Sequence, residues 1–154
     1  MLKAGAKVKI KLTTHDGNSF GYLALGTGKN RKFFLGGATE GDATLFVLEK
    51  YKKANDIFYY RIDGTKKTYL DEHTDGGEVF PEKPFISVDN STIHAWQLND
   101  EGHLEAVYLS TGTTEVLAEP HNRTQLHIRE EHPNAVFCNF EKTSLPYAVE
   151  IIEQ

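Results

Sequence analysis

The chain has 154 residues, of which 39% are hydrophobic and 11% aromatic, enough apolar material for the core of one domain. Its 17 basic and 22 acidic residues give a formal net charge of −5, and both signs are scattered along the chain. Nucleic-acid binding normally requires a basic surface that neutralises phosphates, so the composition argues against a nucleic-acid partner.

The chain has one cysteine, Cys138, which cannot form an internal disulfide and is predicted to be a small buried side chain. No stretch approaches the roughly 18 consecutive apolar residues of a membrane span. Lysines interrupt the first twelve residues, where a signal peptide would need an apolar run. We therefore expect a cytoplasmic protein, or one exported without a signal peptide.

Short runs that alternate apolar and polar residues recur along the chain, and no window shows the apolar stripe of an amphipathic helix. In the first run, residues 6–13, apolar Val8, Ile10 and Leu12 alternate with lysines, as in a strand with one buried face. Similar runs predict strands at 21–25, 32–35, 44–49, 57–62, 68–71, 85–88, 93–98, 104–109, 115–118, 125–128, 135–140 and 147–152. The sequence therefore predicts an all-β protein of about a dozen short strands.

Two sequence elements recur at about one third of the chain length, which indicates three internal repeats. The first is a turn glycine followed by an apolar pair: Gly17 with Tyr22-Leu23, Gly64 with Tyr69-Leu70, and Gly112 with Val116-Leu117. The second is one large aromatic residue per repeat: Phe46, Trp96 and Tyr147, although Phe137 or Phe140 could take the third place. The predicted units cover approximately residues 6–55, 56–102 and 103–154.

These repeats, together with the DATLF…LE motif at residues 42–49, make the chain similar to the β-trefoil superfamily. The resemblance covers Lys7 to Ile152. It implies six strands that close a barrel and three further hairpins that cap one end. The rhythm of residues 21–50 resembles units of hisactophilin, fascin and small fungal trefoil lectins. We therefore predict a single β-trefoil domain over residues 1–154, with a β-sandwich as the alternative fold.

Trp96, the only tryptophan, is predicted to lie in the core because Phe46 and Tyr147 occupy the matching places in the other two repeats. Strict alternation puts His94 and Leu98 on the same face of the strand as Trp96, and Ile93 on the opposite face. If all four side chains are buried, the strand must bend or bulge near one end.

Motifs that carry catalysis or bind metals are absent. There is no phosphate-binding loop, no Gly-x-Ser-x-Gly or Cys-x-x-Cys motif, and no pair of histidines at the spacing typical of zinc ligands. His127 and His132 flank Glu130 and Glu131, an arrangement that we interpret as the solvated rim of a hairpin. We therefore expect a protein that is not an enzyme and that needs no cofactor or metal.

The resemblance to trefoil lectins implies carbohydrate binding through loops between strands, with glycans as the partner. Sugar sites combine an aromatic or apolar wall with a few polar side chains. The loop residues that could supply such groups are Asp16, Asn18, Asp71, His73, His121 and Asn122. The Gln-x-Trp signature of ricin-type lectins is absent, because Gln97 follows Trp96, so no particular sugar is indicated.

Two alternative functions require a protein partner. A protease inhibitor could present the loop at residues 76–85, although its Pro81 and Pro84 are better interpreted as preventing strand pairing at a sheet edge. An actin-binding or cytokine-like interaction module could use the lysine clusters at residues 7–11 and 50–53. Such clusters are more often solvated faces that keep strands from pairing with neighbours.

Overall fold

The computed structural model describes residues 2–28, 32–52, 54–73, 77–84, 87–88, 93–107, 114–139 and 145–154. Within this part of the chain it contains twelve strands and one helix of more than one turn, which confirms the all-β prediction. The strands are β1 (Lys7–Thr13), β2 (Ser19–Leu25), β3 (Phe34–Ala38), β4 (Phe46–Lys50), β5 (Ile57–Ile62), β6 (Tyr69–Glu72), β7 (Val79–Glu82), β8 (Ala95–Leu98), β9 (Leu104–Val107), β10 (Thr114–Ala118), β11 (Phe137–Asn139) and β12 (Ala148–Glu153). The helix is α1 (Arg123–Glu131).

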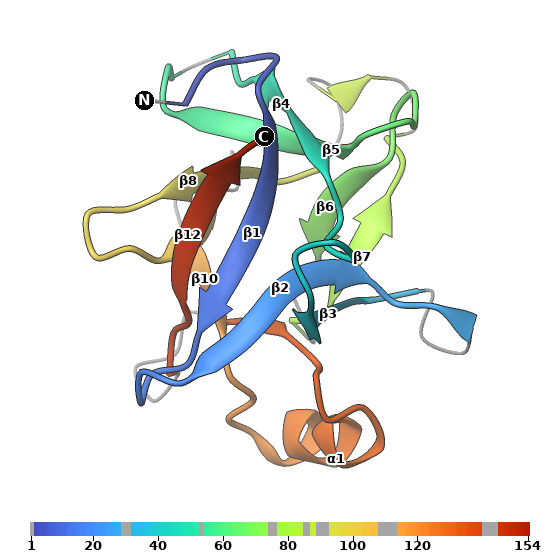
Figure 1. Cartoon of the computed structure of the whole chain (residues 1–154), viewed down its shortest axis with the longest axis vertical. Coiled ribbons are helices and arrows are strands. Elements are labelled where there is room, and N and C mark those ends of the chain that lie inside the picture. Colours follow the sequence, from blue (N-terminus) through green and yellow to red (C-terminus); the bar gives the residue numbers. More distant parts are fainter. Residues whose placement is uncertain are drawn as a thin grey trace.

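All strand pairs are antiparallel and belong to one sheet, whose main order is β11-β10-β9-β8-β5-β4-β1-β2-β3. Two branches leave this path: β12 pairs with β1, and the β6–β7 hairpin is attached through β5. Figure 1 shows β12 alongside β1, with both chain ends at the same end of the molecule. Among the described residues no ladder joins β12 to β9, so the sheet is not closed.

One core cluster contains the residues that the repeats predicted to be equivalent. The aromatic residues Phe46, Trp96 and Tyr147 have no exposed surface, and the same is true of Leu23, Leu70 and Leu117. Phe137, the alternative third aromatic, is also buried, and Phe140 lies outside the described residues. These positions are buried, as the repeats predicted, but the predicted closure of a six-stranded barrel is not observed among the described residues.

Trp96 lies in the core as predicted, and its indole N–H donates a hydrogen bond to the backbone oxygen of Leu70 (2.9 Å). This bond joins β8 to β6, two strands that do not pair with each other. Ile93 and His94 are buried as well, whereas Leu98 at the far end of β8 is 37% exposed. The strand therefore leaves the core after Trp96. Leu98, which alternation places on the same face as Trp96, is for this reason partly exposed.

A smaller apolar cluster covers the outer face of the sheet around Tyr59. Tyr59 packs edge-on against Tyr51 and Tyr69, and Ile93 and Ala95 complete the cluster. It buries the outer side chains of β6, whose inner side chains face the main core. Both faces of β6 are therefore buried, which encloses its two carboxylates, Asp71 and Glu72.

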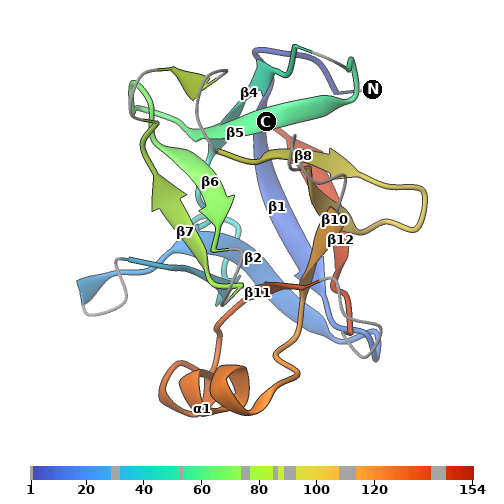
Figure 2. The same cartoon turned by 180° about the vertical axis from the view of Figure 1, so that it is seen from behind.

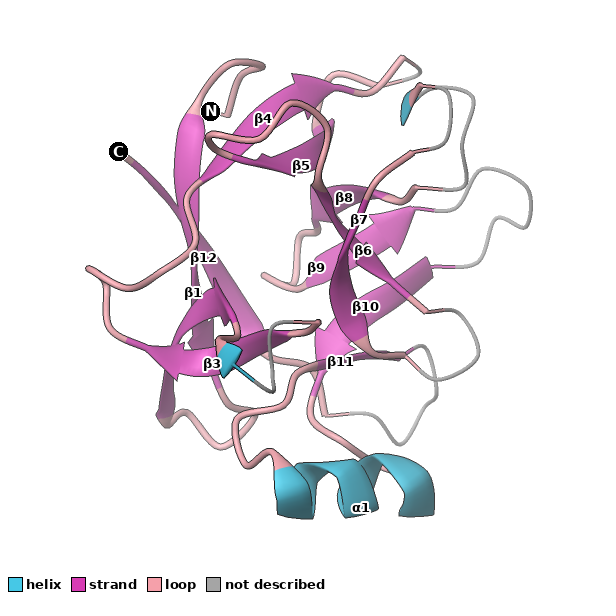
Figure 3. Ribbon diagram, turned by 90° about the vertical axis from the view of Figure 1, so that its right-hand side faces the viewer, coloured by secondary structure: helices cyan, strands magenta, loops and turns pink. Residues whose placement is uncertain are grey.

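The prediction of a strand at residues 125–128 was wrong, because α1 covers this segment. Asn122 caps the helix: its side-chain oxygen accepts a hydrogen bond from the backbone N–H of Gln125 (2.9 Å). Gln-Leu-His-Ile imitates the alternation of a strand, but Leu126 is 49% exposed and only Gln125 is fully buried in the helix. The predicted hairpin rim at 127–132 is accordingly an exposed helix face. Figure 3 shows α1 at one end of the molecule, outside the sheet.

Within the proline-containing segment predicted as a loop at residues 76–85, residues Val79–Glu82 form strand β7, and Gly76 and Phe85 lie outside the described residues. Pro81 lies opposite Leu70 in the β6–β7 ladder, and within the described residues β7 pairs only with β6. Proline is tolerated there because an edge strand has no second partner for its missing N–H. The strand predicted at 85–88 is not observed at Ser87 and Val88, and residues 85 and 86 lie outside the described part.

Two of the three predicted turn glycines have the backbone geometry that requires glycine. Gly17 and Gly64 adopt positive φ angles of 86° and 85°, and Gly112 lies outside the described residues. Among the described helical residues, no helix is both long and apolar enough to cross a membrane.

We predict that Trp96→Ala lowers the free energy of unfolding by about 3–5 kcal/mol, because it leaves a cavity in the core and removes the donor to Leu70. Denaturant unfolding followed by circular dichroism measures this loss. Leu98→Ala in the same strand is the matched control and should cost less than about 1 kcal/mol, because Leu98 is partly exposed. Equal stability of Trp96→Ala and the wild type would show that the ring does not support the core.

Candidate functional site

An open groove of about 500 Å³ lies between the segment that enters β3 and the β6–β7 hairpin. Figure 2 shows this hairpin beside β5, with the segment that leads into β3 nearby. The groove is lined by Lys32, Phe33, His73, Phe80, Pro81 and Glu82. Its size is in the range of small-molecule binding sites, and His73 is one of the residues predicted to bind a ligand.

The central feature of the groove is a stack of two flat rings. The imidazole of His73 lies on the ring of Phe80, with 3.9 Å between ring centroids and 10° between their planes. The register of the hairpin explains this contact: Phe80 pairs with Asp71, and His73 is the next residue on the same face. Because His73 is exposed and Phe80 half-buried, the stack offers a flat surface with a polar edge.

Charged side chains of both signs accompany the rings. Lys32 is exposed, and Glu82 lies on the same face of β7 as Phe80, two residues away. One oxygen of Glu82 already accepts a hydrogen bond from the backbone N–H of Lys83 (2.9 Å), which holds the carboxylate in place. The groove therefore combines an apolar wall with a hydrogen-bond donor and an acceptor.

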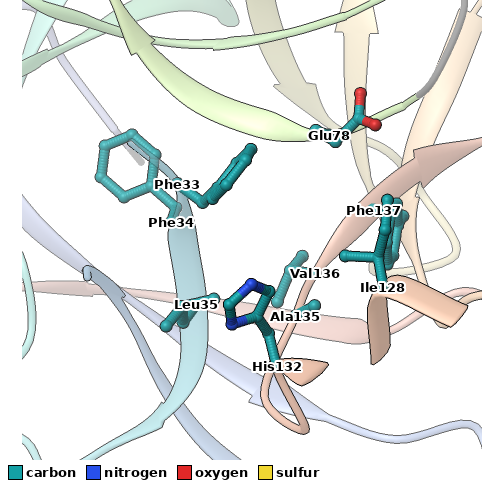
Figure 4. Close-up of a pocket in the computed structure, with 9 residues that line it drawn as sticks. All are labelled: Phe33, Phe34, Leu35, Glu78, Ile128, His132, Ala135, Val136 and Phe137. Atoms are coloured by element: carbon teal, nitrogen blue, oxygen red, sulfur yellow. The ribbon is translucent and has the colours of Figure 1, made fainter. Parts of the chain in front are cut away.

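A second, apolar crevice adjoins the groove and shares Phe33 with it. Figure 4 shows its walls, which come from residues 33–35 on one side and from α1 and the chain after it on the other. His132, at the C-terminal end of α1, lies with its ring centroid 6.4 Å from that of Phe33. The enclosed space is only about 10 Å³, roughly the volume of one water molecule, so this crevice is a packing defect under the helix.

The structure does not bring the six predicted ligand residues together. Asp16 and Asn18 are exposed in the β1–β2 turn, and His73 lines the groove. His121 and Asn122 precede α1: the His121 ring bonds to Gln125 Oε1 (2.9 Å), and Asn122 caps the helix. Asp71 is buried.

The lysines of β1 make contacts within the protein. Lys7 Nζ lies 3.5 Å from the carboxylate of Asp63, and Lys9 Nζ donates to the backbone oxygen of Glu40 (2.7 Å). Of the second lysine cluster, Lys53 lies outside the described residues. These contacts favour the interpretation of the β1 lysines as a solvated face of the sheet.

Asp71 holds His94 in a fixed orientation inside the protein. Its Oδ1 lies 2.6 Å from Nδ1 of the His94 ring and accepts hydrogen bonds from the backbone N–H groups of Glu72 and His94. The opposite ring nitrogen, Nε2, lies 3.3 Å from Oε1 of Glu72. Asp71, predicted as a ligand-binding loop residue, is instead a buried residue of β6 that organises the interior of the protein.

Glu72, Glu115 and Cys138 form a buried cluster that the sequence analysis missed. One carboxylate oxygen from each glutamate and the sulfur of Cys138 lie within 4.8 Å of one another, although the residues come from β6, β10 and β11. Burial, together with the neighbouring carboxyl group of Glu115, raises the pKa of Glu72 to about 10. Cys138 is buried, as predicted, and burial raises the pKa of its thiol. The only sign of this cluster in the sequence is that a glutamate occupies an inward-facing position in each of two strands.

We predict that the metal-free protein loses stability as the pH rises between about 5 and 9. The native state retains a proton on Glu72 that the unfolded chain, with its ordinary carboxyl pKa of 4.5, has released. The groups that face Glu72 are Asp71, Glu78, His94, Glu115 and Cys138. Unfolding in denaturant at several pH values, with a chelator present to keep the protein free of metal ions, measures how the free energy of unfolding changes with pH. Glu72→Gln should flatten this dependence, whereas parallel profiles for the variant and the wild type would refute this prediction.

We predict that Asn122→Ala destabilises α1 by about 0.5–2 kcal/mol, because the backbone N–H of Gln125 loses its acceptor. Amide hydrogen exchange within residues 123–131 measures the effect. Asn122→Ser preserves a capping oxygen and should retain most of the protection. An equal loss in both variants would contradict a capping role for Asn122.

No family model matches the chain, and comparison with curated proteins and with solved structures gave no match.

Proposed function

We propose that the protein is a β-trefoil that binds carbohydrate, without catalysis, in the groove formed by Phe33, His73, Phe80 and their neighbours. The observation that carries this proposal is the stack of His73 on Phe80 at the surface of an open groove. A sugar ring has apolar C–H faces and a rim of hydroxyl groups, so it suits a flat aromatic wall with polar groups at its edges.

The trefoil part of the proposal is supported by the strand pairings. A six-stranded trefoil barrel requires β1 to pair with β12 and β4, and β5 to pair with β4 and β8. It also requires β9 to pair with β8, and all five of these ladders are present. The sixth, between β9 and β12, is replaced among the described residues by one hydrogen bond, from the N–H of Val149 to the oxygen of Gly102 (2.8 Å). The hairpins β2–β3, β6–β7 and β10–β11 are the expected caps.

The polar groups of the groove suit the recognition of hydroxyl groups. His73 and Lys32 can donate hydrogen bonds, and Glu82 can accept them. Of the six ligand residues predicted from the sequence, His73 is the one that lines this groove. The proposal therefore keeps the predicted class of ligand and places it in one groove instead of several loops.

A glycan array, followed by titration of any glycan that binds, tests the proposal. Phe80→Ala should weaken binding about tenfold, because a lost ring contact of about 1–1.5 kcal/mol corresponds to that factor. His73→Ala should also weaken binding. The control is Leu126→Ala, which removes an exposed apolar side chain from α1, outside the groove, and should bind as the wild type does.

Two results would overturn carbohydrate binding in this groove. The first is the absence of any bound glycan at high protein concentration. The second is a glycan that binds Phe80→Ala as tightly as it binds the wild type, which would place the ligand elsewhere on the surface.

A further inference from the structure

We propose that Glu72, Glu115 and Cys138 form a binding site for a divalent transition-metal ion, and that their donor atoms fit Zn²⁺ best. Two carboxylates and one thiol offer their ligand atoms within 4.8 Å of one another. The site lies in the interior, and it is independent of the proposed carbohydrate groove. The sequence contains no metal-binding motif because the three residues are far apart along the chain.

The register of the sheet explains how the cluster assembles. In the β10–β11 ladder, Leu117 pairs with Cys138, so Glu115, two residues from Leu117, lies on the same face and diagonal to Cys138. The β6–β7 hairpin reaches this ladder through the backbone: the N–H of Cys138 donates to the oxygen of Gly77 (2.7 Å). Glu72 pairs with Val79 at that end of the hairpin and points inward with it. Three strands from two hairpins thus converge on one point.

The carboxylate of Glu72 is the observation that points to a ligand. Its side chain is fully buried, and neither of its oxygens has a hydrogen-bond partner of good geometry among the described residues, although Nε2 of His94 lies 3.3 Å from Oε1 and the carboxyl group of Glu115 faces it. Oε2 of Glu115 has no hydrogen-bond partner there either, and this residue is only 9% exposed. Burying an ionised carboxylate costs several kcal/mol, so native proteins almost always satisfy such a group with a proton, a hydrogen bond or a cation.

A shared proton and a bound cation are the two ways to satisfy facing carboxylates. A proton can bridge one oxygen of Glu72 and one of Glu115, but it leaves one negative charge on the buried pair. A divalent cation can contact both carboxylates and the sulfur at once. Its binding releases the protons of Glu72 and of the Cys138 thiol to solvent, and its two positive charges offset two of the three negative charges of the ligands. Because Asp71 and Glu78 also face Glu72, the surroundings favour a cation over a further anion.

The types of donor atom select among cations. Mg²⁺ and Ca²⁺ bind oxygen ligands and avoid thiolates, whereas Zn²⁺ binds thiolate, carboxylate and imidazole in tetrahedral sites. His94 lies beside these ligands: Asp71 contacts its Nδ1, and its Nε2 lies 3.3 Å from Oε1 of Glu72, which fixes the surroundings of that carboxyl group. His94 is therefore a positioning residue beside the three proposed ligands.

Thermal unfolding of the full chain, after treatment with a chelator, tests the site. Zn²⁺ at about one hundred times its dissociation constant should raise the melting temperature by about 5–10 °C, because the ion binds only the folded state. Titration with Co²⁺ should produce a thiolate-to-cobalt charge-transfer absorption band, since Cys138 is the only thiol.

Variants separate this site from metal binding by surface histidines. Glu72→Gln keeps the shape of the side chain and removes a buried charge, so it should fold without metal and lose the Zn²⁺-dependent shift. Cys138→Ser should lose the cobalt band. Glu101→Gln changes a carboxylate that is 79% exposed and should retain both responses.

Each outcome decides the proposal. The site is supported if Glu72→Gln loses the Zn²⁺-dependent shift and Cys138→Ser loses the cobalt band, while Glu101→Gln retains both. A wild type that shows neither the shift nor the cobalt band overturns it. A shift that persists in Glu72→Gln and in Cys138→Ser also overturns it, because the ion then binds elsewhere.

Discussion

The hydrogen bond from Trp96 to the backbone of Leu70, made inside the apolar core, is the contact on which the rest of the structure depends. The indole fills the space between strands too short to form a core individually, and its N–H satisfies a backbone oxygen at the centre of β6. Because β6 is held in this way, its two faces have fixed surroundings. One faces the main core, and the other lies under the cluster around Tyr59.

This arrangement gives the β6–β7 hairpin two different chemical faces. Glu72 and Val79 point inward, toward Glu115 and Cys138, whereas Phe80 and Glu82 line the open groove. The period of two along a strand places these sets on opposite sides. One hairpin therefore contributes to both proposed sites. A metal ion bound inside would brace the strand that carries the groove without contacting a ligand in it.

The difference between what the sequence predicted and what the structure shows is clearest at Asp71 and Asn122. Asp71 ends a predicted strand and Asn122 precedes α1, and at such places polar residues that bind ligands and polar residues that bind the backbone have the same local pattern. The structure shows that Asp71 orients His94 and that Asn122 caps α1. His73 has the same local pattern and lies in the groove. Only the position of the neighbouring strands distinguishes the three, because side chains from distant segments decide what each residue can contact.

The sequence by itself determined the class of fold and most of the core. Alternation predicted most of the strands, and the repeats identified Phe46, Trp96 and Tyr147 as buried, because burial of one strand face is a local property with a period of two. Tertiary structure alone decided which polar residues meet. The stack of His73 on Phe80 depends on hairpin register, and the approach of Glu72, Glu115 and Cys138 depends on three strands converging. Register and convergence are set by pairing between distant segments, which no local pattern encodes.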